Sequence, residues 1–157
     1  MYVTGRLPLL VALGALPVVL VSLAGVDAWA AAAGWIVLCA IAAGTDVAAA
    51  PSPRALRIER RIPRRALLGQ RVETELRLQN TGARRIRGRV RDAWQPTAGA
   101  PYDRLSLDLP GGEARRLVLP LLPRRRGELH SEFVVVRSDG PLRLAGRQTR
   151  LDAPGAL

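Results

Sequence analysis

Residues 7–45 read LPLLVALGALPVVLVSLAGVDAWAAAAGWIVLCAIAAGT, two apolar runs joined at Asp27. The first run, residues 7–26, holds 20 residues without a charge, and the second, residues 28–45, holds 18. An α-helix rises about 1.5 Å per residue, and the hydrocarbon core of a bilayer is about 30 Å thick. Each run is therefore about long enough to cross a membrane, and we predict a hairpin of two transmembrane helices over residues 1–46.

Two other interpretations of this stretch have support in the sequence. Arg6, the first run and then Ala28-Trp29-Ala30 follow the order of a cleavable signal peptide, although the run exceeds the usual apolar length of about 7–15 residues. The second run is rich in alanine, so a buried helix is the alternative there. Cys39, the only cysteine, is expected to be a small apolar helix residue, and a single cysteine excludes an internal disulfide.

The net charge of +11 is unevenly distributed. Residues 1–46 carry a net charge of −1, whereas the rest of the chain, with 23 arginines and 11 acidic residues, carries +12. No lysine occurs, and together with the abundance of Ala, Gly and Pro this indicates a G- and C-rich coding bias and a bacterial source. Because cytoplasmic flanks carry the excess of positive charge, we expect a multi-pass protein of the cytoplasmic membrane with both termini and the β domain cytoplasmic.

Arginines that follow the second run closely are candidates for contact with anionic membrane lipids. A basic residue near the surface of such a membrane contributes about 1 kcal/mol to binding. The six candidates are Arg54, Arg57, Arg60, Arg61, Arg64 and Arg65.

Further arginines form a stripe at residues 84–91 and a run at residues 124–126. We expect a solvated strand face that Glu73, Glu75 and Asp92 partly neutralise. Single-strand nucleic-acid binding needs aromatic platforms between the charges, and the aromatic residues that follow the hairpin are not interleaved with the stripe. Those residues are Trp94, Tyr102 and Phe133. No nucleic acid is therefore expected as a partner.

The chain after the hairpin alternates apolar and polar residues with the period of two that is typical of strands. Pro51-Ser52-Pro53 ends the helix, which makes residues 47–53 a linker. Strands are expected at residues 56–62, 72–79, 86–90, 105–109, 117–121, 133–136 and 142–149. Their number and spacing predict an all-β domain over residues 54–150, an immunoglobulin-like antiparallel β-sandwich, with a small barrel as the alternative.

The same part of the chain offers no group of residues suited to catalysis. His130 is the only histidine, so neither a familiar zinc site nor a nucleophile–base pair can be assembled around it. The acidic residues Asp92, Asp103, Asp108 and Glu113 lack the spacing of a calcium loop, and no glycine-rich phosphate loop occurs. We expect no enzyme activity, no cofactor and no metal site.

Three segments carry a resemblance to a known family. Thr4-Gly5-Arg6 precedes the first apolar run, residues 91–96 read RDAWQP, and residues 123–148 read PRRRGELHSEFVVVRSDGPLRLAGRQ. In this order, with a two-helix hairpin, they resemble the N-terminal portion of bacterial domain of unknown function 58 proteins over nearly the whole chain. Arg143 departs from the pattern, because a glycine is more usual there.

The resemblance implies that a larger cytoplasmic domain, similar to a von Willebrand factor A fold, follows such a region. It also implies a MoxR-type AAA+ ATPase as partner and an assembly role. Residues 151–157 are then expected to be a truncated tail. We expect a non-catalytic, membrane-anchored module that mediates protein–protein assembly, and the alternative is an exported envelope module for binding or adhesion, released by signal-peptide cleavage.

Overall fold

The computed structural model describes residues 1–101 and 104–157, so Tyr102 and Asp103 lie outside the described residues. The chain divides into two compact units, which are described separately. The first comprises residues 1–51 and 139–147, and the second comprises residues 52–138 and 148–157. The turn at residues 139–147, which the sequence assigns to the β domain, thus groups with the helices.

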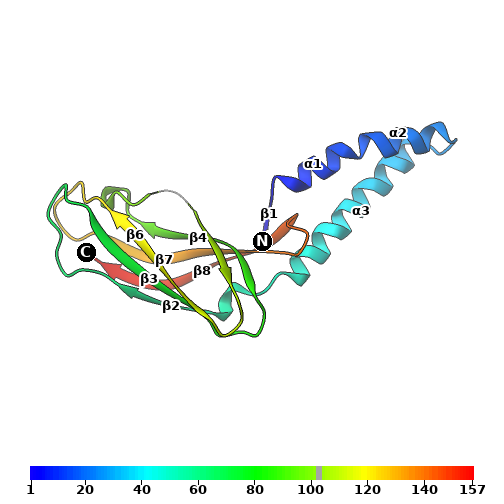
Figure 1. Ribbon diagram of the computed structural model, residues 1–157. Coiled ribbons are helices and arrows are strands. Elements are labelled where there is room, and N and C mark those ends of the chain that lie inside the picture. Colours follow the sequence, from blue (N-terminus) through cyan, green and yellow to red (C-terminus); the bar gives the residue numbers. More distant parts are fainter. Residues whose placement is uncertain (102–103) are drawn as a thin grey trace. The chain divides into compact units, whose positions relative to one another are not determined.

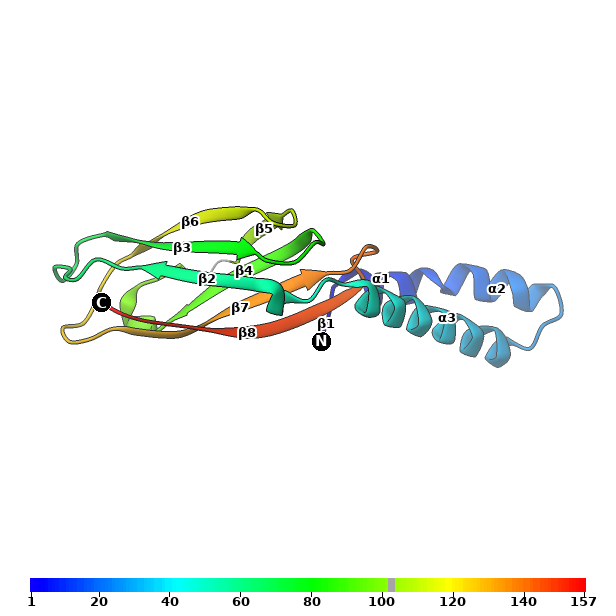
Figure 2. The same ribbon diagram turned by 90° about the horizontal axis from the view of Figure 1, so that it is seen from below.

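The first unit contains the apolar runs as helices. They form α1 (Arg6–Leu13), α2 (Ala15–Leu23) and α3 (Ala28–Ala49), and α1 and α2 run antiparallel to α3 (Figures 1 and 2). The segments Arg6–Leu23 and Ala28–Ala55 are long and apolar enough to cross a membrane by length and composition. The prediction of two apolar helical segments near the N-terminus is confirmed. The first is interrupted at Gly14, where α1 ends and α2 begins.

Two residues shape this pair of helical segments. A Cβ atom on Gly14 would overlap the indole of Trp35, so only glycine lets α1 and α2 approach α3 there. Asp27 begins α3, because its carboxylate accepts a hydrogen bond of 2.9 Å from the backbone N–H of Ala30. Large apolar side chains of these helices stay exposed, among them Leu23 at 80% and Trp29 at 84%.

A buried carboxylate joins the end of α3 to the turn at residues 139–147. The oxygens of Asp46 accept hydrogen bonds from the backbone N–H groups of Leu142 (2.7 Å), Leu144 (2.8 Å) and Ala145 (2.9 Å). A Cβ atom on Gly140 would overlap this carboxylate, so the turn needs glycine there. Asp46 therefore fixes a turn that lies almost a hundred residues further along the chain.

Two more contacts complete this turn. The short strand β1 (Tyr2–Val3) pairs with Gly146 and Ala145, and the hydroxyl of Thr4 donates to the carbonyl oxygen of Arg143 at 2.6 Å. Arg143 has a φ of +56°, the left-handed conformation that favours glycine. A glycine at this position would adopt the same backbone conformation without strain.

The second unit is a two-layer β-sandwich. A three-stranded sheet has the order β2-β3-β6, and the strands of the other sheet that contribute to this unit have the order β8-β7-β4-β5 (Figure 2). The 3₁₀ turns η1 (Pro53–Ala55) and η2 (Pro96–Ala98) precede β2 and follow β4. The strands are β2 (Leu56–Arg61), β3 (Val72–Asn80), β4 (Ile86–Trp94), β5 (Leu105–Leu109), β6 (Ala114–Leu121), β7 (His130–Asp139) and β8 (Ala145–Ala156).

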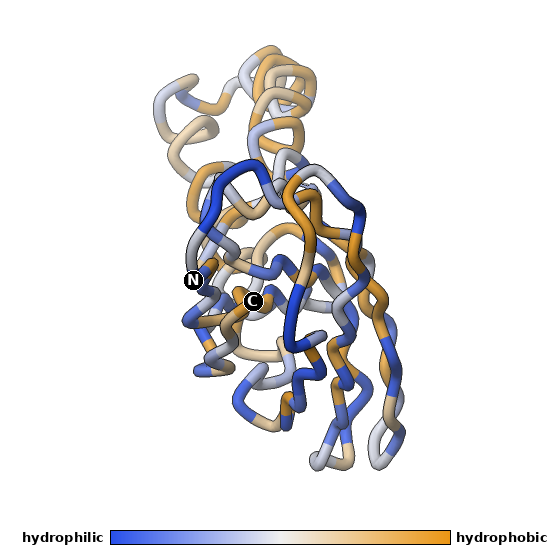
Figure 3. The backbone as a smooth tube through the Cα atoms, turned by 90° about the vertical axis from the view of Figure 1, so that its left-hand side faces the viewer, coloured by the Kyte–Doolittle hydropathy of each residue, from blue (hydrophilic) through white to orange (hydrophobic). Residues whose placement is uncertain are grey.

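The core lies between the two sheets, and the alternation of hydropathy along the strands is visible in Figure 3. Leu76, Leu78 and Leu119 come from one sheet and Val90 and Val134 from the other, and all five are buried. The predicted β-sandwich is confirmed, and two separate sheets exclude the small closed barrel for the described residues.

The last strand differs from the prediction. It begins at Ala145 instead of residue 142, because Leu142 and Arg143 form the turn that Asp46 binds. It continues to Ala156, so residues 151–156 are strand and not tail. The reason is that Leu151 and Ala153 pack against the core of the sandwich and keep the alternating pattern going.

Candidate functional site

Strand pairing brings two arginine-containing loops together at one end of the three-stranded sheet. Val72 of β3 lies opposite Leu121 of β6, so the loop before β3 and the loop after β6 emerge side by side. The backbone N–H of Gly69 donates a hydrogen bond of 2.9 Å to the carbonyl oxygen of Pro123, which links the two loops. Gly69 has a φ of +76°, a conformation open to glycine without strain.

A groove of about 630 Å³ opens between these loops. Its floor includes Val72, Leu129 and Leu157, which belong to a small apolar cluster at this end of the sandwich. Leu129 and Leu157 exchange two backbone hydrogen bonds of 2.9 and 3.0 Å, which fix the floor. Five arginines line the groove, which we call the arginine groove: Arg64, Arg65, Arg71, Arg125 and Arg126.

The arginine groove is strongly unbalanced in charge. Glu128 is its one acidic lining residue, and that carboxylate lies 3.4 Å from His130 Nε2. Within residues 1–101 and 104–157, none of the five groove arginines has a carboxylate within 4.0 Å. Their positive charge is therefore available to an external anionic group.

A second depression, on the outer face of the three-stranded sheet, provides a contrast. Its volume is about 340 Å³, and its lining includes Glu59 and Glu75 as well as arginines. Arg116 pairs with Glu75, and Arg77 lies 3.9 Å from Glu59. Two of the four arginines there, Arg77 and Arg116, thus have a carboxylate partner, whereas none of the five arginines of the arginine groove has one within the described residues.

Apolar side chains accompany the charges of the groove. Leu67 and Leu68 follow Arg64 and Arg65 in the loop before β3, and their exposed fractions are 71% and 53%. Exposed leucines beside an apolar floor favour a ligand that has apolar groups as well as negative charge.

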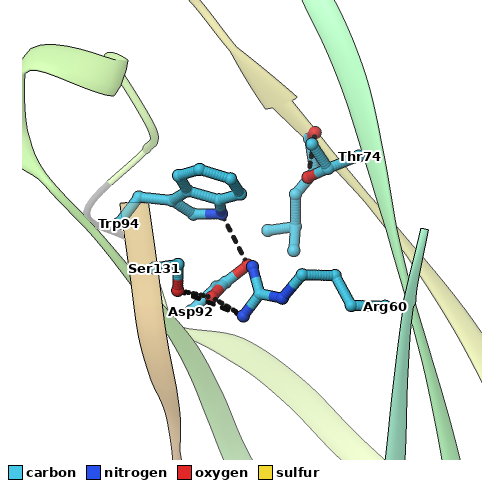
Figure 4. A network of polar contacts seen from close by, with 6 residues as sticks. Arg60, Thr74, Asp92, Trp94 and Ser131 are labelled. Carbon is cyan, nitrogen blue, oxygen red and sulfur yellow. Dashed lines mark hydrogen bonds and ion pairs between the residues drawn. The ribbon is translucent and has the colours of Figure 1, made fainter. Parts of the chain in front are cut away.

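A buried ion pair lies deeper in the sandwich, near the same end. Arg60 of β2 and Asp92 of β4 come from opposite sheets, and their side chains are 4% and 2% exposed (Figure 4). The contact is bidentate, with distances of 2.9 Å from Arg60 Nη1 to Asp92 Oδ2 and 2.7 Å from Nη2 to Oδ1. Such planar pairing is the strongest that an arginine and a carboxylate form.

Two further residues complete this network. Trp94 Nε1 donates to Asp92 Oδ2 at 2.7 Å, and the hydroxyl of Ser131 donates to Asp92 Oδ1 at 2.9 Å. The indole of Trp94 also lies against the Arg60 guanidinium, 5.2 Å from ring centroid to Cζ. Because Trp94 belongs to the same apolar cluster as Val72 and Leu129, the network supports the floor of the arginine groove from inside.

The six arginines proposed from the sequence as lipid contacts do not form one set. Arg60 is enclosed with Asp92, so its guanidinium is not available to a lipid headgroup, and this part of the expectation needs correction. Arg64 and Arg65 line the arginine groove, and Arg61 lines the smaller depression. Arg54 and Arg57 are exposed, with Arg57 Nε 3.8 Å from Glu59.

The arginine stripe of residues 84–91 is partly neutralised, but by a different acid from the one expected. Asp108 of β5 lies 2.8 Å from Arg85 Nε and 3.6 Å from Arg87 Nε. Asp92 was expected to help there and instead points into the sandwich. Strand parity explains this, because Asp92 shares the inward face of β4 with Val90 and Trp94.

The same parity rule would have found Arg60. In residues 56–62, the apolar positions are Leu56, Ile58 and Ile62, and Arg60 falls in step with them. A charged residue at the inward position of each of two facing strands signals a buried pair. The arginine groove, in contrast, depends on the pairing of distant strands.

The residues that commonly bind metals are dispersed over residues 1–101 and 104–157. No group of three or more His, Cys, Asp or Glu residues lies close enough to hold a metal ion there. His130 begins β7 with a side chain that is 46% exposed, and Cys39 is buried in α3. The expectations for Tyr102 and Asp103 concern residues outside the described part.

No family model matches the chain, and no curated protein matches it. Among solved structures, the chain is similar to the ASH/PapD-like domain of human CEP192 (PapD-like domain 7), with 18% identity and a TM-score of 0.41. The match covers 67% of this chain and 87% of that domain. The likeness concerns a sandwich fold alone.

Proposed function

We propose that this chain is a membrane-anchored, non-catalytic β-sandwich module of a domain of unknown function 58 protein, and that it mediates protein–protein assembly. The observation that carries the proposal is the arginine groove, a concave surface with an apolar floor and five unpaired arginines. A surface of this kind is suited to recognition, since it provides both apolar contact and charge. A MoxR-type AAA+ ATPase is the proposed partner.

The proposal places the β-sandwich on the cytoplasmic side of a bacterial membrane. Its support is the absence of basic residues between the two apolar segments and their abundance after Ala49. A fluorescent-protein fusion and an alkaline phosphatase fusion, each placed after Leu157, test this placement in cells. We expect fluorescence from the first and no phosphatase activity from the second, whereas an active phosphatase would contradict a cytoplasmic sandwich.

The partner is tested by binding. The full chain in neutral detergent micelles is immobilised, and the MoxR-type ATPase of the same genome is passed over it. We expect saturable binding that the charge reversal Arg125→Glu/Arg126→Glu weakens. Absence of saturable binding would contradict the choice of partner, and hydrolase or ATPase activity of the purified chain alone would contradict its non-catalytic role.

An exported module for envelope binding or adhesion is the second candidate. The observation that favours it is the position of the first apolar segment directly after Arg6, with Ala28-Trp29-Ala30 behind it. N-terminal sequencing of the protein isolated from cells separates the two candidates. A start near Ala31 supports export, and a start at Met1 supports the anchored module.

A further inference from the structure

We infer that the arginine groove binds a short acidic peptide segment with apolar side chains, supplied by a partner protein. The inference rests on the proposed assembly function and specifies the chemistry of the segment recognised. Three features of the groove support the inference: an apolar floor, a rim of unpaired arginines, and a hydrogen bond that holds the two loops together.

The floor accepts apolar side chains. Val72, Leu129 and Leu157 line it, and the two backbone hydrogen bonds between Leu129 and Leu157 hold it in place. The volume of about 630 Å³ lies in the range of about 300–1,000 Å³ that is usual for ligand pockets. A leucine or phenylalanine side chain of an extended peptide therefore fits the space.

The rim selects negative charge. Arg64, Arg65 and Arg71 come from the loop before β3, and Arg125 and Arg126 come from the loop after β6, so cations flank the floor on both sides. An extended peptide that places an apolar residue on the floor and carboxylates beside it can meet both loops. Guanidinium groups bind carboxylates in a bidentate geometry, which adds direction to the attraction.

A peptide fits this surface better than a membrane does. A groove receives a side chain, whereas contact with a flat lipid surface requires a protruding patch. Along the chain, Arg54 is close to the end of α3, but Arg64 and Arg65 are separated from it by the whole of β2. By its place in the sequence, Arg54 is therefore the candidate for contact with lipid headgroups, whereas Arg64 and Arg65 belong to the groove.

The test measures binding of a defined probe to the full chain in neutral detergent micelles. The probe is a fluorescent peptide with two leucines flanked by aspartates and glutamates, followed by fluorescence anisotropy. We expect saturable binding that weakens as salt is raised, since exposed charges are screened. Failure of this peptide to bind at low salt would overturn the inference.

Two double variants of equal charge change locate the binding. Arg125→Glu/Arg126→Glu reverses two groove arginines, and we expect it to raise the dissociation constant about tenfold or more. Arg89→Glu/Arg115→Glu reverses two exposed arginines outside the groove and should change the dissociation constant less than about threefold. That smaller change is the effect of the altered net charge alone. Equal losses in both variants would show unspecific attraction and overturn the inference.

The apolar half of the inference has its own readouts. Leu67→Ser/Leu68→Ser in the protein and serines in place of both leucines in the peptide should each weaken binding, because exposed leucines take part without holding the fold. A peptide with full affinity after loss of its leucines would overturn the inference. In a competition experiment, vesicles of phosphatidylglycerol are compared with vesicles of phosphatidylcholine. If only phosphatidylglycerol displaces the peptide, and the displacement depends on the groove arginines, lipid is the favoured ligand and the inference of a peptide ligand is overturned.

These results are separable from failure of the proposed function. The fusions after Leu157 and binding of the ATPase test anchoring and assembly without using the peptide. If both succeed and the peptide does not bind, assembly uses another surface and only the inference fails. If the fusion is exported, the assembly proposal fails whatever the peptide does.

Discussion

At the scale of single residues, the ion pair of Arg60 and Asp92 is the most consequential feature of the β-sandwich. Burial removes both groups from water, and the cost is offset only because every oxygen of the carboxylate is hydrogen-bonded. The Nε atom of Arg60 is buried without a hydrogen-bond partner in the described part of the chain. The pair is therefore sensitive to loss of either partner.

We predict that Asp92→Ala lowers the free energy of unfolding by about 3–5 kcal/mol, because it leaves the Arg60 charge buried and unpaired. The double variant Arg60→Met/Asp92→Leu should recover most of that loss, since no charge is then enclosed. Urea unfolding in detergent measures both, in chains that also carry Trp29→Phe and Trp35→Phe so that the fluorescence comes from Trp94. A double variant as unstable as the single one would contradict this account.

The pair formed by Arg85 and Asp108 is the matched control for that experiment. Its atoms are 2.8 Å apart, but the side chains are 51% and 49% exposed. Surface pairs contribute about 0.2–1 kcal/mol, so Asp108→Ala should have a much smaller effect than Asp92→Ala. If Asp92→Ala and Asp108→Ala lowered the free energy of unfolding equally, burial would not determine the cost of losing the carboxylate.

Arg143 gives a second prediction at this scale. A residue with a Cβ atom pays about 1 kcal/mol for the left-handed conformation, and glycine does not. The bond from Thr4 goes to the backbone oxygen, so it survives substitution. We expect thermal stability of the full chain to fall in the order Arg143→Gly, Arg143→Asn, Arg143→Val. The valine variant being the most stable would contradict the assigned backbone conformation.

At the scale of elements, the first unit depends on the contact between α3 and the turn at residues 139–147. Three backbone N–H groups of that turn share one carboxylate, so its removal takes the acceptor from all three at once. Hydrogen bonds to a charged group contribute about 1.5–3 kcal/mol each. The turn is therefore held by a residue of the helix and not by its own sequence alone.

We predict that Asp46→Asn raises the hydrogen-exchange rates of the Leu144 and Ala145 amides about tenfold or more. An asparagine keeps the size of the side chain but presents an N–H₂ group to backbone donors, which weakens local protection. Amides of Leu76 and Leu78 in β3 serve as the internal control and should not change. Unchanged exchange at Ala145 would contradict the role of Asp46.

The elements differ in how far sequence alone predicts them. Continuous apolar runs predict α2 and α3, and strict alternation predicts β3 from Val72 onward, because both signals are local. The role of Asp46 could not be predicted, since its partners lie about a hundred residues away. The arginine groove likewise needs the pairing of Val72 with Leu121, although the basic run at residues 124–126 was visible.

At the scale of the whole molecule, the helices and the sandwich differ in the kind of surface that they expose. The apolar helices expose large side chains, which lipid would cover in the proposed membrane topology. The unpaired arginines are suited to an anionic segment. In the proposed function, anchoring and recognition would use different residues, so each could be changed without loss of the other.

The proposed topology predicts where a membrane-impermeant maleimide can react in intact cells. Cys39→Ala removes the native thiol, and Val26→Cys or Ser106→Cys then supplies a single exposed one. The turn at Val26 should be labelled from outside, because two crossings place it opposite the sandwich. Ser106→Cys, on β5, should react only after the cells are permeabilised. Labelling of Ser106→Cys in intact cells would contradict the cytoplasmic sandwich, and protection of Val26→Cys would contradict a hairpin that crosses the membrane.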